Sequence, residues 1–337
     1  MIKENISLQP FNTFGIGVSA RYFASFQSEE NVLELLQSKL IGSYSPLILG
    51  GGSNILFTKD VDGLVLKNEI GGIELIHQDN EYIYVKVGAG VSWHAFVMYC
   101  IDNNYAGVEN LSLIPGNAGA SPMQNIGAYG VEIKDVFHSL EAIHIQDKTK
   151  VVFNNNECNF GYRESVFKNK FKNQFVITSV TYQLKKTPVF NISYGAISQE
   201  LEKMGASELS IKVISQAVMN IRRSKLPDPK LIGNAGSFFK NPEISSTQFE
   251  KLKIQFPNIV GHPTEHDFVK VAAGWLIEQA GWKGFRDGDA GCHEKQALVL
   301  VNHGNATGLQ ILELSENIIH SVNDKFGIEL SREVNIM

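Results

Sequence analysis

The first half of the chain alternates short apolar runs with glycine-rich turns, a pattern typical of strands that end in loops. Residues 46–49 are an apolar run that leads directly into Gly50, Gly51 and Gly52. Residues 81–87 are rich in β-branched and aromatic side chains and also stop at glycines. On the same grounds we expect further strands at 21–26, 63–66, 175–184, 297–301 and 328–337.

Apolar residues at helical spacing predict three helices. The first follows Ser92 as N-cap, ends at Asn103 and Asn104, and has an apolar stripe of Trp93, Phe96, Val97, Cys100 and Ile101. A second is expected near 271–280. The last begins at Thr307, which forms a capping box with Gln310, and is followed by Gly327 at the position that favours glycine. Its stripe is Ile311, Leu314, Ile318, Val322 and Phe326.

Two segments fit neither the helical nor the strand pattern of apolar residues. Residues 113–130 are rich in glycine and alanine, which inside a globular chain indicates a functional loop. Residues 225–230 (KLPDPK) are a proline-rich break and favour a domain boundary.

Composition narrows the class of protein. The chain has 337 residues, of which 43% are hydrophobic, and a formal net charge of -5. It is therefore long and apolar enough for two or three folded domains, and it has no overall attraction for nucleic acid or an anionic membrane. The three cysteines are far apart, the first residues lack an apolar leader core, and no apolar run approaches the length of a membrane span. We expect a cytoplasmic protein that binds neither nucleic acid nor membrane.

Three short patterns are misleading. Residues 15–20 match G-x-G-x-x-A, but a strand-like run follows them instead of a helix, so we interpret them as a turn. Residues 262–266 match H-x-x-E-H, but Pro263 opposes the helix that a zinc site requires, so we expect a polar loop and no metal. The basic run at 168–172 is typical of a solvated face.

The glycine-rich segment at 50–54 is a candidate phosphate-binding loop. Successive glycines let backbone amides approach an anion, and Ser53 and Asn54 add polar side chains. A glycine-rich hairpin explains the same residues equally well. Together with the loop at 113–130, the segment is suited to hold a large dinucleotide in extended form.

Several longer motifs resemble one family along the whole chain, the UDP-N-acetylenolpyruvoylglucosamine reductases. They are NTF at 12–14, LGGGSN at 49–54, IPG at 114–116, QNIGAYG at 124–130, YRES at 162–165, KLPDPK at 225–230, GNAGSFFKNP at 233–242, AGWLI at 273–277 and EV at 333–334.

The resemblance implies an α+β fold with two FAD-binding subdomains of the vanillyl-alcohol-oxidase (PCMH) type and a C-terminal α/β substrate-binding domain. It implies subdomains at 1–69 and 70–215, with 328–337 returning near the flavin, and a substrate-binding domain at 216–327. The segment at 192–195 resembles the longer subclass, in which a tyrosine on a mobile loop covers the substrate. We expect a monomer.

The resemblance also implies the reaction, in which NADPH reduces the enolpyruvyl ether of UDP-N-acetylglucosamine to UDP-N-acetylmuramate through FAD. Hydride addition at C3 leaves negative charge on C2 and on the carboxylate. In the matched motifs, Arg163 is suited to bind that carboxylate, and Ser237 to protonate C2. Glu333 is suited to bind there protonated, or to hold a water that shares the charge.

Further site residues are implied by position in the matched motifs. We expect FAD to bind without a covalent link, because the two glycine loops contain no His or Cys. The residues expected to contact FAD are Gly50, Gly51, Gly52, Ser53, Asn54, Ile114, Pro115, Gly116, Ser121, Pro122, Ile126, Gly127 and Ala128. The UDP-sugar is expected to contact Tyr129, Tyr162, Tyr194, Lys225, Asn241, Lys270 and Gln296. The tyrosines at 129 and 162 are equally explained as packed core residues.

Two alternatives stay open. One is another FAD oxidoreductase of the same fold with a different substrate. The other is a catalytically silent protein that binds a UDP-sugar, against which the set Arg163, Ser237 and Glu333 argues.

Overall fold

The computed structural model describes residues 1–42, 44–264 and 266–337. The chain divides into two compact units. The first comprises Met1–Ile6, Ala20–Gly51 and Val61–Ser224, and the second comprises Ser7–Ser19, Gly52–Asp60 and Lys225–Met337. One division falls inside the glycine-rich loop, and another falls at the proline-rich break. The three-domain arrangement stays a prediction.

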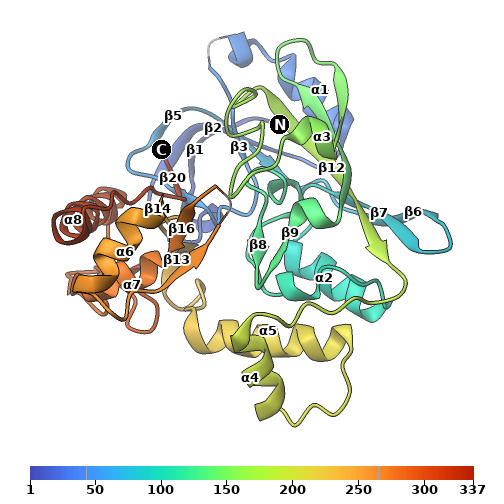
Figure 1. The fold of residues 1–337 in the computed structure, drawn as a ribbon. Helices are drawn as coiled ribbons and strands as arrows, with labels where there is room; N and C mark the ends of the chain where they lie inside the picture. The colour runs from blue at the N-terminus through green and yellow to red at the C-terminus, as the bar shows by residue number, and fades with distance from the viewer. Residues whose placement is uncertain (43, 265) are drawn as a thin grey trace. The chain divides into compact units, whose positions relative to one another are not determined.

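A four-stranded sheet of the first unit contains the strand that leads into the glycine loop (Figure 1). Its order is β1 (Lys3–Ser7), β2 (Ser19–Phe26), β5 (Val61–Asn68) and β3 (Leu47–Leu49), and β2 and β3 both run parallel to β5. Apolar residues of α1 (Glu29–Leu36) pack against this sheet because Val32 and Leu36 share one core with Leu66. The 3-10 helix η2 (Lys39–Gly42) follows α1.

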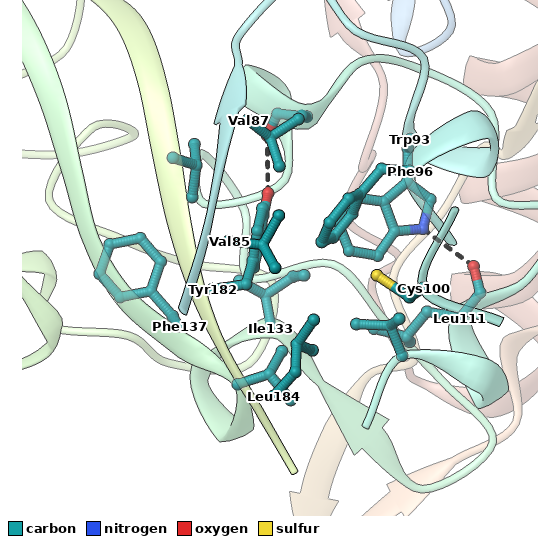
Figure 2. Close-up of a cluster of buried hydrophobic side chains, with 14 of the residues drawn as sticks. Val85, Val87, Trp93, Phe96, Cys100, Leu111, Ile133, Phe137, Tyr182 and Leu184 are labelled. Atoms are coloured by element: carbon teal, nitrogen blue, oxygen red, sulfur yellow. Dashed lines mark hydrogen bonds between the residues drawn. The ribbon is translucent and has the colours of Figure 1, made fainter. Parts of the chain in front are cut away.

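A five-stranded antiparallel sheet forms the centre of the first unit. Its order is β11 (Lys150–Asn154), β10 (Phe137–His144), β12 (Phe175–Lys185), β7 (Tyr82–Gly88) and β6 (Ile73–Gln78). Helix α2 (Trp93–Asp102) packs its apolar stripe on this sheet, and Phe96 stacks on Tyr182 with ring centroids 4.6 Å apart. Figure 2 shows this core, in which the buried Trp93 indole donates to the Leu111 carbonyl at 2.9 Å.

The remaining elements of the first unit are short turns and a helix pair. Helices α4 and α5 pack together through Ile197, Leu201 and Ile214. The turns between α2 and β12 carry most of the candidate site. The elements are η3 (Glu109–Leu111), η4 (Ala118–Ala120), β8 (Gly127–Ala128), β9 (Val131–Glu132), η5 (Ile133–Asp135), α3 (Asn155–Cys158), α4 (Gly195–Lys203) and α5 (Ile211–Lys225).

The described residues of the second unit form three small sheets, three α-helices and one 3-10 helix (Figure 1). One sheet has the order β13 (Gly233–Ser237), β19 (Val299–Asn302), β18 (Ala290–Cys292), β17 (Arg286–Asp287). A second has the order β14 (Glu243–Ser245), β16 (Phe268–Val271), β15 (Gly261–Pro263), and in the third β20 (Asn335–Ile336) runs parallel to β4 (Ile55–Leu56). The helices are η1 (Gln9–Phe11), α6 (Ser246–Gln255), α7 (Ala273–Gln279) and α8 (Gly308–Phe326).

The predicted elements are confirmed with one exception. The strand expected over the tail at 328–337 is limited to Asn335–Ile336, because residues 331–333 make only isolated backbone bonds to residues 238–240. Helix α8 has the predicted capping box at Thr307 and the left-handed Gly327, at φ 64°.

Two of the three misleading patterns lack the helix that their motif requires. Strand β2 follows the G-x-G-x-x-A segment where a dinucleotide site requires a helix. In the H-x-x-E-H segment His262 and Pro263 lie in β15, which pairs with β16, so the expectation of a polar loop is wrong for these two residues. His266 has a left-handed φ of 57°, so the two histidines do not share a helical face. Glu265 of that segment lies outside the described residues.

Candidate active site

The glycine loop begins where β3 ends, and its glycines are required by close backbone packing. A Cβ atom on Gly51 would lie 2.8 Å from Asn117 Oδ1 and 2.9 Å from Gly116 Cα, so any side chain there forces the two glycine-rich loops apart. Gly52 has the left-handed φ of 63°, and a Cβ on it would overlap the Phe11 carbonyl oxygen.

The second loop, residues 113–130, is tied to the start of α2. The Trp93 amide donates to the Gly116 carbonyl at 2.9 Å, and the Asn117 side chain donates to the Gly90 carbonyl at 2.8 Å. The Leu113 amide donates to His94 Nδ1 at 3.1 Å. These bonds fix the loop that faces Gly51.

Two of the predicted flavin contacts in this loop are buried. The Ser121 hydroxyl is 2.8 Å from the Tyr182 hydroxyl inside the core, and Pro122 is also buried. Gly127 and Ala128 form β8, which pairs with β9, and Ile126 packs against the core. Ile114 is half-buried, and Pro115 is exposed.

Arg163 is held by this same loop. It has a left-handed φ of 55°, which is costly for a residue with a side chain, in a tight turn where Gly161 pairs with Glu164. Its guanidinium donates to the Gly127 carbonyl at 2.6 Å and to the Asn125 carbonyl at 3.5 Å. The same guanidinium lies 5.3 Å from the centroid of the Tyr162 ring. The structure thus brings Arg163 to the Gln124–Gly130 motif.

Arg222 is a residue of this region that the sequence patterns do not identify. Its Nε donates to the Leu113 carbonyl at 3.3 Å, and it hydrogen-bonds the Tyr129 side chain. Burial lowers the pKa of Arg222 and raises the pKa of Tyr129, and each partner partly opposes the other's shift. Burial, together with the nearby Arg223 and Arg222, also lowers the pKa of His94. The pair of arginines after α5's apolar stripe was the only clue in the sequence.

Tyr194 meets Tyr129 at the start of α4. Their rings are 5.3 Å apart and nearly perpendicular, and Tyr194 is 50% exposed. The preceding segment is attached by Asn191, whose side chain donates to the Gly130 carbonyl at 2.9 Å and whose carbonyl accepts from the Asn110 side chain at 2.8 Å.

In the second unit, Ser237 and Glu333 lie on neighbouring backbone segments. Ser237 ends β13 and pairs with Val299, and the Phe238 and Phe239 side chains that follow are buried. The Glu333 amide donates to the Phe238 carbonyl at 2.8 Å, so Glu333 is held one residue away from Ser237. Gly236, with a φ of 70°, turns the chain just before the exposed Ser237.

Asn54 connects the glycine loop to Glu333 within this unit. Its side-chain amide donates to the Glu333 carbonyl at 3.3 Å, and its own carbonyl accepts from the Asn335 side chain at 2.8 Å. Asn54 therefore positions the segment that carries the predicted catalytic glutamate.

Two of the predicted substrate residues each lie beside the first residues of α7. Asn241 Oδ1 accepts from the Ala273 amide at 3.0 Å, and Gln296 Oε1 would lie 3.0 Å from a Cβ on Gly274. Lys270 on β16 is in register with Glu243, to which its ammonium is 3.4 Å distant. Lys225 is exposed at the end of α5.

The predicted catalytic residues are divided between the units. Arg163 belongs to the first, and Ser237 and Glu333 belong to the second. Their assembly into one catalytic set stays a prediction.

The described residues offer neither a metal-binding cluster nor a membrane-spanning helix. No three His, Cys, Asp or Glu side chains in the described ranges converge so as to hold a metal ion. Among the helices of the same ranges, none combines the length and apolar character needed to span a membrane.

Comparison with known proteins gives full-length matches. The chain is 51% identical over 337 residues to the UDP-N-acetylenolpyruvoylglucosamine reductase of Flavobacterium johnsoniae, covering 100% of this chain and 99% of that protein. It is 50% identical over 336 residues to the enzyme of the same name from Amoebophilus asiaticus, covering 100% and 99%. The chain belongs to the UDP-N-acetylenolpyruvoylglucosamine reductase family.

Domain matches agree with this family. Residues 228–337 match the model described as UDP-N-acetylenolpyruvoylglucosamine reductase, C-terminal domain, and residues 20–151 match an FAD binding domain. The solved structure of UDP-N-acetylenolpyruvylglucosamine reductase from Thermus caldophilus has the same fold, with a TM-score of 0.70 at 23% identity, over 100% of this chain and 99% of that chain. The predicted fold class, an FAD-binding domain followed by the C-terminal domain of this family, is confirmed. The subclass is not resolved.

The residues of the first unit fit the flavin of an FAD-binding domain. A Cβ on Gly51 would intrude on Gly116 and Asn117, so the backbones of the two glycine-rich loops lie close together. Arg163 donates to carbonyls of the second loop, to which Tyr129 belongs. The individual flavin and substrate contacts listed from the sequence stay predictions.

Proposed function

We propose that this chain catalyses the NADPH-dependent, FAD-mediated reduction of UDP-N-acetyl-3-O-(1-carboxyvinyl)glucosamine to UDP-N-acetylmuramate, a step of peptidoglycan precursor synthesis. The observation that carries the proposal is the end-to-end match to reductases of this name at 51% identity. When bound, FAD supplies the hydride chemistry between NADPH and C3 of the enolpyruvyl group. The other tasks fall to side chains of this chain.

Arg163 binds the substrate carboxylate in this proposal. A guanidinium offers a planar fork of donors that matches a carboxylate, and it stabilises the negative charge that the carboxylate acquires as C3 accepts hydride. The bonds from Arg163 to the Gly127 and Asn125 carbonyls support this role because they set the direction of the fork.

Ser237 delivers the proton to C2, and Glu333 assists. Ser237 lies at the end of strand β13 and its side chain is exposed, which supports its role as proton donor. The Glu333 carboxyl, on the segment bonded to Phe238, either binds the enolate in its protonated form or holds a water that does so.

Lys225, Asn241, Lys270 and Gln296 bind the UDP-sugar in the same proposal. Lysine ammonium groups suit a diphosphate as mobile point charges. The grouping of Asn241 and Gln296 at the start of α7 supports a common role for them.

Tyr194 covers the bound substrate, as in the longer subclass to which we assign this chain. The contact of its half-exposed ring with Tyr129, and the Asn191 bonds to Gly130 and Asn110, support a segment that docks beside the site. Limited proteolysis at 185–200 tests the assignment. We expect saturating UDP-sugar to protect this segment, and unchanged cleavage would contradict the lid.

The absorbance spectrum of the purified protein tests the proposed function. We expect a flavin spectrum that bleaches with anaerobic NADPH and recovers when the enolpyruvyl substrate is added. Recovery with O₂ and an alcohol, but indifference to NADPH, would indicate another FAD oxidoreductase. UDP-sugar binding without flavin absorbance would indicate a silent binding protein. The expected cytoplasmic, monomeric state belongs to the same proposal, and light scattering tests its oligomeric part.

A further inference from the structure

Lys67 lies behind the glycine loop and holds one of its carbonyl groups. The parallel pairing of β3 and β5 places Lys67 opposite Leu49, the last residue before the loop. From there its ammonium donates to the Gly50 carbonyl at 2.7 Å. The sequence patterns give no reason to single out this lysine.

The ammonium of Lys67 has little electrostatic compensation. The side chain is half-buried, and this burial lowers its pKa, with only the charge of Glu69 opposing the shift. Within the described ranges Lys67 forms no ion pair, whereas Lys86 and Lys150 of the same unit both pair with Glu141. A cation removed from water without a carboxylate is costly, so this position favours the arrival of an anion nearby.

The geometry of a trans peptide gives this hydrogen bond a consequence on the other side of the loop. The C=O and N–H groups of one trans peptide point in opposite directions, and the chain has no cis peptide among its described residues. By fixing the Gly50 carbonyl, Lys67 therefore fixes the direction of the Gly51 N–H, which points away from the ammonium.

The Gly51 amide has no acceptor in the described part of the protein. It lies where Gly51 packs against Gly116 and Asn117, at the meeting point of the two glycine-rich loops. A charged donor on the carbonyl of a peptide also polarises its N–H and makes that N–H a stronger donor.

We propose that Lys67 is a positioning residue that orients and polarises the Gly50–Gly51 peptide so that the Gly51 amide binds the diphosphate of FAD. The inference rests on the proposed function only in naming FAD as the anion. It predicts that Lys67 contributes to the binding of a flavin that carries phosphate and not to the binding of one that lacks it.

Flavin titration of the full-length protein, stripped of its cofactor, tests this proposal. We expect Lys67→Met to weaken FAD binding about tenfold, the effect of losing one charge-assisted hydrogen bond, and to leave riboflavin binding unchanged. Higher ionic strength should weaken FAD binding to the wild type more than to Lys67→Met. Lys67→Gln, which retains a donor but no charge, should lie between the two, and Lys67→Arg should restore most of the affinity. Lys86→Met is the matched control because that lysine is also half-buried but pairs with Glu141.

The outcomes separate this proposal from the proposed function. FAD affinity unchanged in both Lys67→Met and Lys67→Gln would overturn the role of Lys67. Equal weakening of FAD and riboflavin would overturn it as well, because it would show a general loss of loop structure. A wild-type protein that binds no FAD would contradict the proposed function instead.

Discussion

The predicted catalytic side chains of the two units are held by different means. Arg163 sits in a left-handed turn, and the bonds that orient it are made by its own guanidinium to loop carbonyls. Ser237 sits at the end of a strand, and it is oriented by backbone pairing with Val299 and by the buried rings of Phe238 and Phe239. At position 163 a change of side chain therefore removes both the chemistry and the anchor, whereas at position 237 the chemistry is separable from the geometry.

The largest expected effect comes from Ser237→Ala, which tests the predicted proton donor at the end of β13. Reoxidation of the reduced enzyme by the enolpyruvyl substrate should slow by about 10²–10⁴-fold, because C2 loses its acid. Reduction by NADPH should stay nearly normal, because that step delivers no proton to carbon. Stopped-flow absorbance reads both phases, and Ser237→Cys should recover part of the loss. Equal slowing of both phases would falsify the proton-donor role and indicate a displaced flavin.

Arg163→Lys should reduce kcat/KM by about 10²–10³-fold, the typical cost of one missing electrostatic donor. It should also lower the free energy of unfolding by about 1–2 kcal/mol, because the bonds to Gly127 and Asn125 are weakened. Ser237→Ala should leave the free energy of unfolding within about 0.5 kcal/mol of wild type. Urea denaturation of the two variants checks this contrast. Equal stability of the two variants would show that Arg163 and Ser237 do not differ in how much they contribute to the fold.

Gly51→Val should weaken FAD binding by about 10–100-fold, since forcing a side chain against Gly116 and Asn117 costs about 1–3 kcal/mol. Gly17→Val is the matched control, because a Cβ on Gly17 meets nothing within 4 Å and its φ is not left-handed. Flavin content after purification is the measurement. A full complement of flavin in Gly51→Val would show that the loops tolerate separation.

The smallest expected effect concerns Glu141 on β10, in the five-stranded sheet of the first unit. Burial raises the pKa of Glu141, but hydrogen bonds from Lys86, Lys150 and Ser179 outweigh it and bring the pKa down to about 2. A carboxyl whose folded pKa is depressed stabilises the fold above its unfolded pKa, and this contribution is lost as the pH falls from about 4.5 towards about 2. Because the group is partly exposed, we expect only about 1 kcal/mol. Glu141→Gln should flatten the fall in urea stability between pH 5 and pH 3, roughly the span of that titration. An unchanged pH dependence would show that the three hydrogen bonds contribute nothing net.

The sequence predicts best what is decided locally. Helix α8 is confirmed from its capping box to Gly327, because both caps and the apolar stripe are written within one segment. Strand β12 was also recognisable because it is rich in β-branched and aromatic residues and is buried along nearly its whole length. The hairpin of β10 and β11 was not predicted, because β10 gains its burial between β11 and β12 and β11 is mostly exposed.

The site shows the same limit. The matched motifs predict Arg163, Ser237 and Glu333 as site residues, and the structure shows the contacts around each. Arg222 and Lys67 escaped notice because what distinguishes them is contact with loop carbonyls distant in sequence, at Leu113 and Gly50. The tail at 328–337 misled the prediction because its alternating pattern reflects burial of Ile328, Leu330 and Val334 and not a continuous ladder.

The link between Asn54 and Glu333 implies thermodynamic reciprocity. Strand β4 follows Asn54 directly and pairs with β20, so hydrogen bonds link the end of the glycine loop to the segment at 333–336. If a ligand of the loop raises the hydrogen-exchange protection of the Glu333 and Asn335 amides, then fixing that segment must raise the affinity of the loop for the ligand by the same factor. In that case Glu333, which we propose acts on the UDP-sugar substrate, is also coupled to the retention of FAD.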